Sequence, residues 1–355
     1  MIYCFGVRKL KKVLIGMSGG VDSSVAAKLL KDNGYSVTGA TMLLWNDTEK
    51  AAADAERVCS HIGIDFITID FREKFRKCVV NYFTSEYICG RTPNPCIMCN
   101  KHLKFGAMLD YALENGFDFI ATGHYGKIIN NGGTYELHSS AAAKKDQSYF
   151  LYNFTQHILA HTLMPLSDYC KEQVRLIAEQ CGIPVANKPD SQEICFVADD
   201  DYAKFICEYS GYTPKKGKIL DISGNEIGEH KGLIYYTIGQ RKGLGAFGRP
   251  MFVMDINPEN NTITLGEKGM EFSDSLMAEN VNYISGTPLN EPVRLTAKVR
   301  YQAEKASAIV YPVSEDKVKL VFDFPQRAVT PGQAVVFYDG DTVIGGGTAV
   351  KQENP

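Results

Sequence analysis

Residues 17–24 read Met-Ser-Gly-Gly-Val-Asp-Ser-Ser, and the segments on either side of this stretch decide the fold. The apolar run at 13–17 is typical of a strand covered on both faces of a parallel sheet. Residues 21–33 carry apolar side chains at helical spacing and are followed by Gly34, which predicts a helix. Glycines allow close approach of a ligand, and amides at a helix N-terminus favour an anion. We therefore expect a phosphate site in this turn.

The spacing within the turn excludes two familiar phosphate loops. It lacks the Lys-Ser/Thr ending of a Walker A loop, which disfavours γ-phosphate transfer of that type. It also does not match the Gly-x-Gly-x-x-Gly pattern of dinucleotide-binding folds. The turn is therefore a phosphate site of another kind.

Strands and helices alternate through the first half of the chain. This alternation predicts βαβ units and a mostly parallel, doubly wound α/β sheet. Further strands are expected at 36–44, 64–69 and 119–122, and further helices at 47–61, 103–115 and 171–181.

The pattern changes after about residue 197. One helix is expected at 202–209, followed by closely spaced glycines and prolines. Five short runs then predict a small antiparallel β-barrel, at 295–300, 306–311, 317–322, 333–338 and 343–350. We expect three domains: a catalytic α/β domain at 1–197, a small central domain at 198–285 and a β-barrel at 286–355.

The composition is that of an ordinary globular protein. The chain has 355 residues, 45% of them hydrophobic and 22% charged, with a net charge of −3, which excludes a disordered chain and binding to nucleic acid by bulk basicity alone. The longest uncharged run, 147–167, contains too many polar residues for a membrane span. Ten cysteines without an export signal indicate reduced thiols, so we expect a cytoplasmic protein with no membrane partner.

Two segments that contain cysteines further limit the reactions that the chain is expected to catalyse. The first reads Gly-Arg-Thr-Pro-Asn-Pro-Cys-Ile-Met-Cys-Asn-Lys at 90–101, and the second reads Asp-Ser-Gln-Glu-Ile-Cys-Phe at 190–196. We expect a helix to begin near Cys99, within the first of these segments. A thiol at a helix N-terminus has a lowered pKa, so a thiolate would be available for nucleophilic work.

The Ser-Gly-Gly-Val-Asp-Ser-Ser run resembles the pyrophosphate loop of the adenine-nucleotide α-hydrolase-like enzymes. Together with the two cysteine segments, further motifs closely resemble the tRNA-specific 2-thiouridylases from about residue 12 to residue 349. These motifs lie at 121–125, 145–151, 228–232, 236–245, 300–301 and 330–333.

The resemblance implies a reaction. ATP is cleaved between its α and β phosphates, AMP is transferred to the position-2 oxygen of the wobble uridine of tRNA, and sulfur then replaces that oxygen. Cys195 would carry the sulfur as a persulfide, and Cys99 would be the paired nucleophile that releases it as a disulfide forms. A persulfide donor protein, such as a cysteine desulfurase or a sulfur relay protein, is required, and Mg²⁺ would neutralise the ATP phosphates.

The resemblance also assigns residues to binding roles. The ATP site would be lined by Gly16, Met17, Ser18, Gly19, Gly20, Val21, Asp22, Ser23, Met42 and Gly123. The target base would contact Asn94, Pro95 and Cys96. The tRNA would contact His124, Lys145, Asp146, Gln147, Arg300, Tyr301 and Gln333.

Cys96 departs from the family pattern, because many members have Asp at this position. A third thiol opens a second interpretation, in which Cys96, Cys99 and Cys195 ligate an iron–sulfur cluster. A zinc site would need two more ligands that no tight spacing supplies. Spacing and the availability of a thiolate favour persulfide chemistry without a resident metal.

Two other classes of function share some of these features. An ATP-dependent amidating ligase would use the same loop but should not need Cys99 and Cys195. A non-catalytic RNA-binding module would bind tRNA without consuming ATP. Replacing each cysteine with Ser and assaying sulfur incorporation into tRNA would identify the ligase, and tight RNA binding without pyrophosphate release would identify the binding module.

Overall fold

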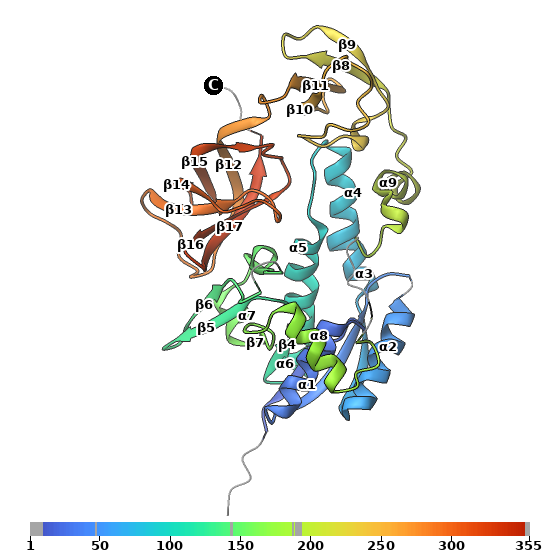
Figure 1. Ribbon diagram of the computed structural model, residues 1–355, viewed down its shortest axis with the longest axis vertical. Coiled ribbons are helices and arrows are strands. Elements are labelled where there is room, and N and C mark those ends of the chain that lie inside the picture. Colours follow the sequence, from blue (N-terminus) through green and yellow to red (C-terminus); the bar gives the residue numbers. More distant parts are fainter. Residues whose placement is uncertain (1–9, 47, 143–144, 187, 189–193, 352–355) are drawn as a thin grey trace, which may run out of the picture. The chain divides into compact units, whose positions relative to one another are not determined.

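The computed structural model describes residues 10–46, 48–142, 145–186, 188 and 194–351 (Figure 1). These residues form two compact units, each assembled from separate stretches of the chain. The first lies within 1–75, 100–148 and 154–191, and the second within 76–99, 149–153 and 192–355. The domain boundaries expected at 197/198 and 285/286 stay a prediction.

The first unit is built on a five-stranded parallel sheet with the order β3-β2-β1-β4-β7. Its strands are β1 (Lys12–Gly16), β2 (Ser36–Leu43), β3 (Asp65–Asp70), β4 (Phe119–Ala121) and β7 (Thr162–Leu163). After β1 the chain adds β2 and then β3 on one side of β1, and it later adds β4 on the other side of β1. In such sheets ligands bind at the carboxyl ends of the strands beside this reversal.

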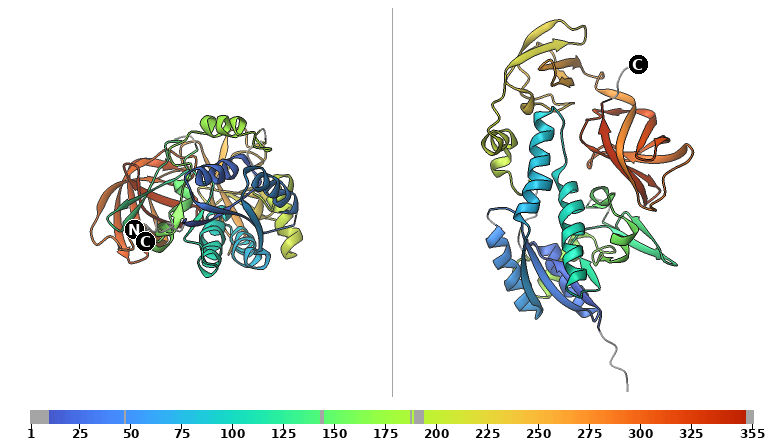
Figure 2. Two further views of the ribbon diagram at one scale, coloured as in Figure 1. Left: turned by 90° about the horizontal axis from the view of Figure 1, so that it is seen from below. Right: turned by 180° about the vertical axis from the view of Figure 1, so that it is seen from behind.

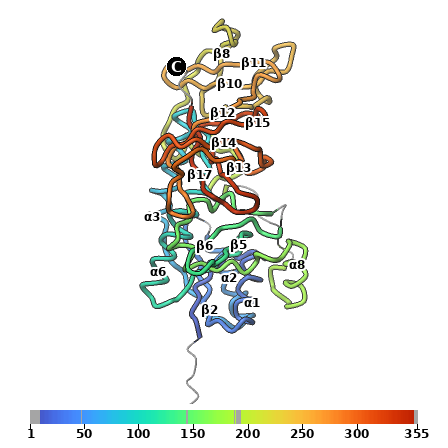
Figure 3. Tube along the Cα trace, turned by 90° about the vertical axis from the view of Figure 1, so that its left-hand side faces the viewer, coloured from blue at the N-terminus to red at the C-terminus, as the bar shows by residue number. Residues whose placement is uncertain are grey.

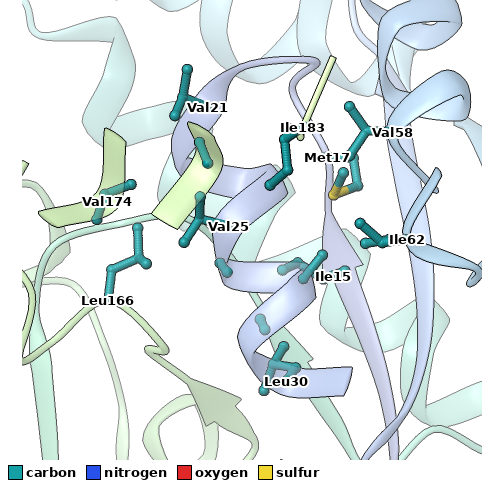
Figure 4. Close-up of a cluster of buried hydrophobic side chains, with 14 of the residues drawn as sticks. Ile15, Met17, Val21, Val25, Leu30, Val58, Ile62, Leu166, Val174 and Ile183 are labelled. Atoms are coloured by element: carbon teal, nitrogen blue, oxygen red, sulfur yellow. The ribbon is translucent and has the colours of Figure 1, made fainter. Parts of the chain in front are cut away.

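Helices cover both faces of this sheet. Alternate residues of β1 and of the following turn pack with α1 (Val21–Asp32), α2 (Thr48–Ile62) and α8 (Lys171–Gln180) in one core (Figure 4). Gly16 faces the other way, toward Met108 of α6 (Met108–Glu114). In the left view of Figure 2, the blue α1 and the teal α6 lie on opposite sides of the sheet. The expected doubly wound α/β fold is confirmed.

One helix begins earlier than expected. The helix expected at 103–115 is confirmed, but the expectation that helical structure begins near Cys99 is wrong, because it starts at Pro95. It continues through α5 (Pro95–Cys99), the π-helical η2 (Asn100–Ala107) and α6. Asn94 and Pro95 are good residues for a helix cap and first turn, which explains why the helix begins before Cys99.

The first unit also contains shorter elements. A hairpin of β5 (Lys127–Asn131) and β6 (Thr134–His138), joined by Gly132 and Gly133, was not anticipated. The other short elements are α3 (Arg72–Phe75) and α7 (Gln156–Ala160). Among the described residues, no helix is long and apolar enough to cross a membrane.

The second unit combines helices with a small sheet. The helical segments η1 (Arg76–Val80) and α4 (Asn81–Ile88) follow each other directly, and α9 (Tyr202–Ser210) confirms the helix expected at 202–209. A four-stranded sheet has the order β10-β11-β8-β9. Its strands are β8 (Gly217–Asp221), β9 (Glu226–His230), β10 (Met251–Asn257) and β11 (Thr262–Glu267). Short 3-10 turns occur at Ser148–Leu151, Ala198–Asp200 and Leu233–Tyr235.

The expected antiparallel barrel is present, but it has six strands rather than five (Figures 1 and 3). They are β12 (Phe272–Tyr283), β13 (Val293–Lys298), β14 (Ala306–Ser314), β15 (Lys317–Arg327), β16 (Ala334–Asp339) and β17 (Thr342–Val350). Their order is β12-β15-β14-β13-β16-β17, and pairing of β12 with β17 closes the barrel. The strand that was not predicted is β12. Its polar residues and β-bulges interrupt the alternation of apolar and polar side chains that predicts a strand.

Candidate functional site

The phosphate loop joins the end of β1 to the start of α1. Gly20 is the N-cap of α1 and has no side chain to occupy the first amides of the helix. Inside the loop, the Ser18 amide donates to Ser23 Oγ at 3.2 Å, and Ser24 Oγ donates to the Gly20 carbonyl at 2.7 Å. These hydrogen bonds, made by serine hydroxyls of the loop, stabilise the conformation of the turn. The arrangement is that of an anion site at the N-terminus of a twelve-residue helix.

Two glycines are required by close packing around this loop. Gly19 has φ +67°, and a Cβ there would lie 2.7 Å from the Ala51 carbonyl oxygen. Gly123, after β4, would place a Cβ 2.6 Å from the Ser23 amide nitrogen. The structure therefore brings Gly123 against the start of α1, and its expected place in the ATP site stays a prediction.

Asp22 is held by two partners at the start of α1. Its Oδ1 accepts a hydrogen bond from the Tyr125 hydroxyl at 2.7 Å, and both carboxylate oxygens accept from Lys171 Nζ at 2.8 Å. Lys171 is the first residue of α8, so this carboxylate links α1, α8 and the segment after β4. Its predicted part in lining the ATP site stays a prediction.

A second lysine reaches the loop from the far end of the unit's sequence. Lys188 Nζ donates to the Gly19 carbonyl at 3.0 Å and to Asp54 Oδ2 at 2.8 Å. Asp54 lies in α2 and also pairs with Arg57. Hydrogen bonds from Lys188 and then Arg57 lower the pKa of the Asp54 carboxyl. The sequence alone does not predict this group, because no local pattern pairs residues that far apart in the chain.

A surface pocket of about 600 Å³ lies beside the loop's sheet. Its lining begins at Leu43, directly after Met42 of β2, and includes Trp45 and Arg72. Thr48, at the start of α2, donates to the Trp45 carbonyl at 2.8 Å. Met42, expected in the ATP site, therefore lies at the carboxyl end of the strand that borders this pocket.

His124, directly after Gly123, is half-buried. Its Nδ1 lies 2.8 Å from Thr122 Oγ1, and its ring packs against Phe105 with centroids 5.5 Å apart. Burial, and secondarily the charge of Lys104, hold the pKa of His124 well below its usual value. The imidazole is therefore neutral at physiological pH.

The segment 145–147 is organised by internal hydrogen bonds. Asp146 Oδ2 accepts from Ser148 Oγ at 2.7 Å, and Oδ1 accepts from the Ser140 amide at 2.9 Å. The Gln147 amide donates to the Tyr125 carbonyl at 2.7 Å, while its side-chain oxygen accepts from the Tyr125 amide at 3.0 Å. The Lys145 amide donates to the Ala142 carbonyl at 2.7 Å. These contacts shape the segment, and its expected contact with tRNA stays a prediction.

In the second unit, Asn94 caps the helix that carries two of the cysteines. Asn94 Oδ1 accepts a hydrogen bond from the Cys96 amide at 3.2 Å, and Pro95 is the first residue of α5. Cys96 is exposed, whereas Cys99 is only 7% exposed. Cys99 is the fifth residue of the helix, so the expectation that it lies at a helix N-terminus is wrong. Cys96 has that position instead.

The exposed Cys195 is anchored by its neighbour. Phe196 packs edge-on against Phe83 of α4 with ring centroids 5.3 Å apart, and against Phe205 of α9 at 5.2 Å. The helix that carries Cys99, α5, packs against η1, which runs directly into α4. The segments bearing the two thiols therefore pack against successive parts of one helical stretch, 76–88.

The cysteines of the described residues are all free thiols. Within those residues, no three His, Cys, Asp or Glu side chains are grouped so that they could hold a metal ion. Cys96, Cys99 and Cys195 are all described, and in this arrangement they do not fit an iron–sulfur cluster.

Gln333 supports the chain before Asn94. Its Nε2 donates to the Thr92 carbonyl at 2.7 Å, and the Thr92 amide donates to the Pro331 carbonyl at 3.0 Å. A Cβ on Gly332 would lie only 3.0 Å from the Thr92 nitrogen. The Thr-Pro-Gly-Gln motif thus holds residue 92, two positions before the expected base-binding residues.

Arg300 and Tyr301 are also engaged within the second unit. Arg300 Nη2 donates to the Ala328 carbonyl and, at 3.3 Å, to Thr330 Oγ1. Burial lowers the pKa of Arg300, and its Nε is buried without a hydrogen-bond partner in the described structure. The Tyr301 ring packs against Phe150 with centroids 4.4 Å apart. Their expected contacts with tRNA stay predictions.

Comparison with known families gives three adjoining matches. A tRNA methyl transferase HUP domain model matches residues 11–199, a tRNA methyl transferase PRC-barrel domain model matches 203–267, and an aminomethyltransferase beta-barrel domain model matches 273–349.

Relatives match almost the whole chain. A tRNA-specific 2-thiouridylase MnmA from Clostridioides difficile is 53% identical over 96% of this chain and 98% of its own length. A tRNA-specific 2-thiouridylase MnmA from Acetivibrio thermocellus is 52% identical over 95% and 98%. Among solved structures, the NMN synthetase of Francisella tularensis is 18% identical, with a TM-score of 0.36 over 58% of this chain and 80% of that one. That likeness is too weak to support an argument.

Proposed function

Because the chain belongs to the family of tRNA-specific 2-thiouridylases, we propose that it is a tRNA-uridine 2-sulfurtransferase that uses ATP to thiolate the wobble uridine of tRNA. The observation that carries this proposal is the identity of about half of all residues with such enzymes over 96% of the chain. The glycine-walled anion site at the start of α1 supports it, because the reaction needs a site for the ATP phosphates. We propose that the protein works in the cytoplasm, where thiols remain reduced.

The first step turns an oxygen into a good leaving group. The position-2 oxygen of uracil is a poor leaving group, so it attacks the α-phosphorus of ATP and pyrophosphate departs. We propose that the ATP site comprises residues 16–23, Met42 and Gly123. Both carboxylates beside the loop, Asp22 and Asp54, already pair with lysines. A bound Mg²⁺ would therefore take its ligands mainly from phosphate oxygens and water, and would neutralise phosphate charge.

The second step replaces that oxygen by sulfur. The terminal sulfur of a Cys195 persulfide attacks C2, and the C2–O bond breaks as AMP leaves with the oxygen. The Cys99 thiolate then attacks Cys195 Sγ, which breaks the S–S bond and leaves the sulfur on C2. The two cysteines are oxidised to a disulfide while the persulfide sulfur is reduced. A thiol reductant resets the pair, and a persulfide donor protein reloads Cys195.

The remaining site residues would hold the RNA. We propose that Asn94, Pro95 and Cys96 contact the target base, and that His124, residues 145–147, Arg300, Tyr301 and Gln333 contact tRNA. A neutral His124 can offer a ring nitrogen without a charge. We also propose the division into a catalytic domain at 1–197, a central domain at 198–285 and a tRNA-binding barrel at 286–355.

An iron–sulfur route remains the alternative for the same product. We derive no step through a cluster, because the three thiols are not grouped as its ligands among the described residues. Anaerobic purification with iron and sulfide assays tests it. Stoichiometric iron that is lost in Cys96→Ala would overturn the cluster-free mechanism.

The proposal is tested by incubating the chain with unmodified tRNA, ATP and a persulfide donor. Nucleoside mass spectrometry should detect 2-thiouridine, with pyrophosphate released in proportion. Cys195→Ser and Cys99→Ser should each abolish the product, whereas Cys89→Ser, which alters another exposed thiol, should not. Unchanged ATP-dependent activity in both catalytic variants would favour an amidating ligase. Binding of tRNA without pyrophosphate release would favour a non-catalytic module.

A further inference from the structure

The ammonium group of Lys188, a residue far from the phosphate loop in the sequence, is hydrogen-bonded to that loop. It lies 3.0 Å from the Gly19 carbonyl oxygen and 2.8 Å from Asp54 Oδ2. Asp54 is 8% exposed and belongs to α2, which also packs against Gly19 so closely that no Cβ fits there. The position of the lysine is therefore set by a buried carboxylate and a rigid turn.

The charges of this cluster do not cancel. Asp54 pairs with both Lys188 and Arg57, and its pKa is lowered, so one negative charge meets two positive charges. The cluster carries a net charge of +1 beside a loop whose amides already favour anions. An ion pair that only closed the turn would need one lysine and one carboxylate. The surplus positive charge points to an anionic ligand.

Lys188 also has donor capacity in reserve. A lysine ammonium has three N–H donors, and two of them are used by acceptors in the described part of the chain. Its side chain is 39% exposed, so the ammonium group is accessible from solvent beside the loop.

We propose that Lys188 contacts the pyrophosphate portion of ATP in the glycine loop, and that Asp54 is the residue that positions it. This inference rests on the proposed function, because cleavage between the α and β phosphates leaves pyrophosphate as the anion that the loop must hold and release. Lys188 stabilises the charge on the leaving pyrophosphate, while the AMP portion is held by other residues.

The test compares ligands that share only part of ATP. Binding of inorganic pyrophosphate and of AMP to the full chain is measured by calorimetry for the wild type, Lys188→Met and Lys188→Arg. Lys188→Met should weaken pyrophosphate binding by about tenfold or more, the scale of one lost hydrogen bond to a charged group, and leave AMP binding unchanged. Lys188→Arg, which keeps the charge, should bind pyrophosphate more tightly than Lys188→Met.

Lys28→Met is the matched control. Lys28 pairs with Asp32 on α1, away from the loop, so its loss should change neither ligand. If Lys188→Met unfolds at the assay temperature, Lys188→Gln gives the same comparison, because its amide can still donate hydrogen bonds without a charge.

Two results would overturn the inference: unchanged pyrophosphate binding in Lys188→Met, or an equal loss for AMP and pyrophosphate, which indicates a general collapse of the loop. Failure of the wild type to bind pyrophosphate would also count against it. A wild type that binds pyrophosphate but makes no 2-thiouridine would instead contradict the proposed function.

Discussion

Cys99 and Cys195 have opposite exposures, although the proposed reaction uses both thiols. Cys99 is 7% exposed on α5, whereas Cys195 is exposed beside the buried Phe196. An exposed thiol suits the residue that must accept sulfur from a donor protein. A sheltered thiol suits the residue that acts only after the persulfide has been delivered.

Alkylation should reproduce this difference. In the wild type without ligands, iodoacetamide should modify Cys195 and Cys96 several times faster than Cys99, because the reagent reaches exposed thiols first. Peptide mass spectrometry over a time course measures the three rates. Equal rates, or faster labelling of Cys99, would contradict the exposures described above.

His124 should make stability depend on pH in a defined direction. Its pKa is well below the usual value in the folded protein, so the unfolded chain takes up a proton first as the pH falls through about 6.5. Stability from this residue is present above that pH and is lost below it. The free energy of unfolding should therefore fall more steeply from pH 7 to pH 5 in the wild type than in His124→Gln. Urea unfolding at both pH values measures this, and parallel decreases would refute it.

Site residues that follow a local pattern could be predicted from the sequence, whereas those that depend on distant partners could not. The glycine loop was identified because its residue types carry the chemistry themselves. Lys188 and Asp54 were missed because their pairing depends on how α2 meets the end of the first unit's chain. The position of Cys99 was misjudged because Asn94 and Pro95 start the helix one turn earlier.

At the level of elements, the start of α5 combines a structural cap with an expected base contact. Asn94 accepts a hydrogen bond from the Cys96 amide, and N-caps of this kind contribute about 1 kcal/mol. The π-helical η2 follows, where a Cβ on Gly106 would lie 2.8 Å from the Lys101 carbonyl oxygen. Such wide turns occur frequently at functional sites.

Asn94 variants should separate its two roles. Asn94→Ala should lower the free energy of unfolding by about 1 kcal/mol, because the Cys96 amide loses its acceptor. Asn94→Asp keeps an acceptor and should restore stability, but it should not restore 2-thiouridine formation if the amide group also contacts the base. Urea unfolding and nucleoside mass spectrometry measure the two effects. Full recovery of activity in Asn94→Asp would show that Asn94 acts only as a helix cap and that its amide group does not contact the base.

Gly123 lies where the segment after β4 contacts the start of α1, and we expect that no side chain is tolerated at this position. Gly123→Ala should cost about 1–3 kcal/mol, because its Cβ would lie 2.6 Å from the Ser23 amide nitrogen. Gly228→Ala is the control, since its Cβ would lie 3.6 Å from the nearest atom, Ile219 Cδ1. Thermal unfolding and ATP binding of both variants check this. Equal stability of the two would contradict the packing.

For the whole molecule, the sequence predicted the parallel sheet and the barrel but not every strand. β1 was predicted within one residue because an apolar run buried on both faces is a strong signal. β12 was missed because its register slips at bulges where it pairs with β15 and with β17. The four-stranded sheet was hidden among turn residues, since β8 and β9 are short and largely polar.

The assignment of ATP to oxygen removal can be tested by following one atom. A tRNA whose wobble uridine carries 18O at position 2 is incubated with the chain, ATP and a persulfide donor, and the AMP produced is analysed by mass spectrometry. We expect one 18O in AMP for every 2-thiouridine formed. Formation of 2-thiouridine with unlabelled AMP would contradict adenylation of that oxygen.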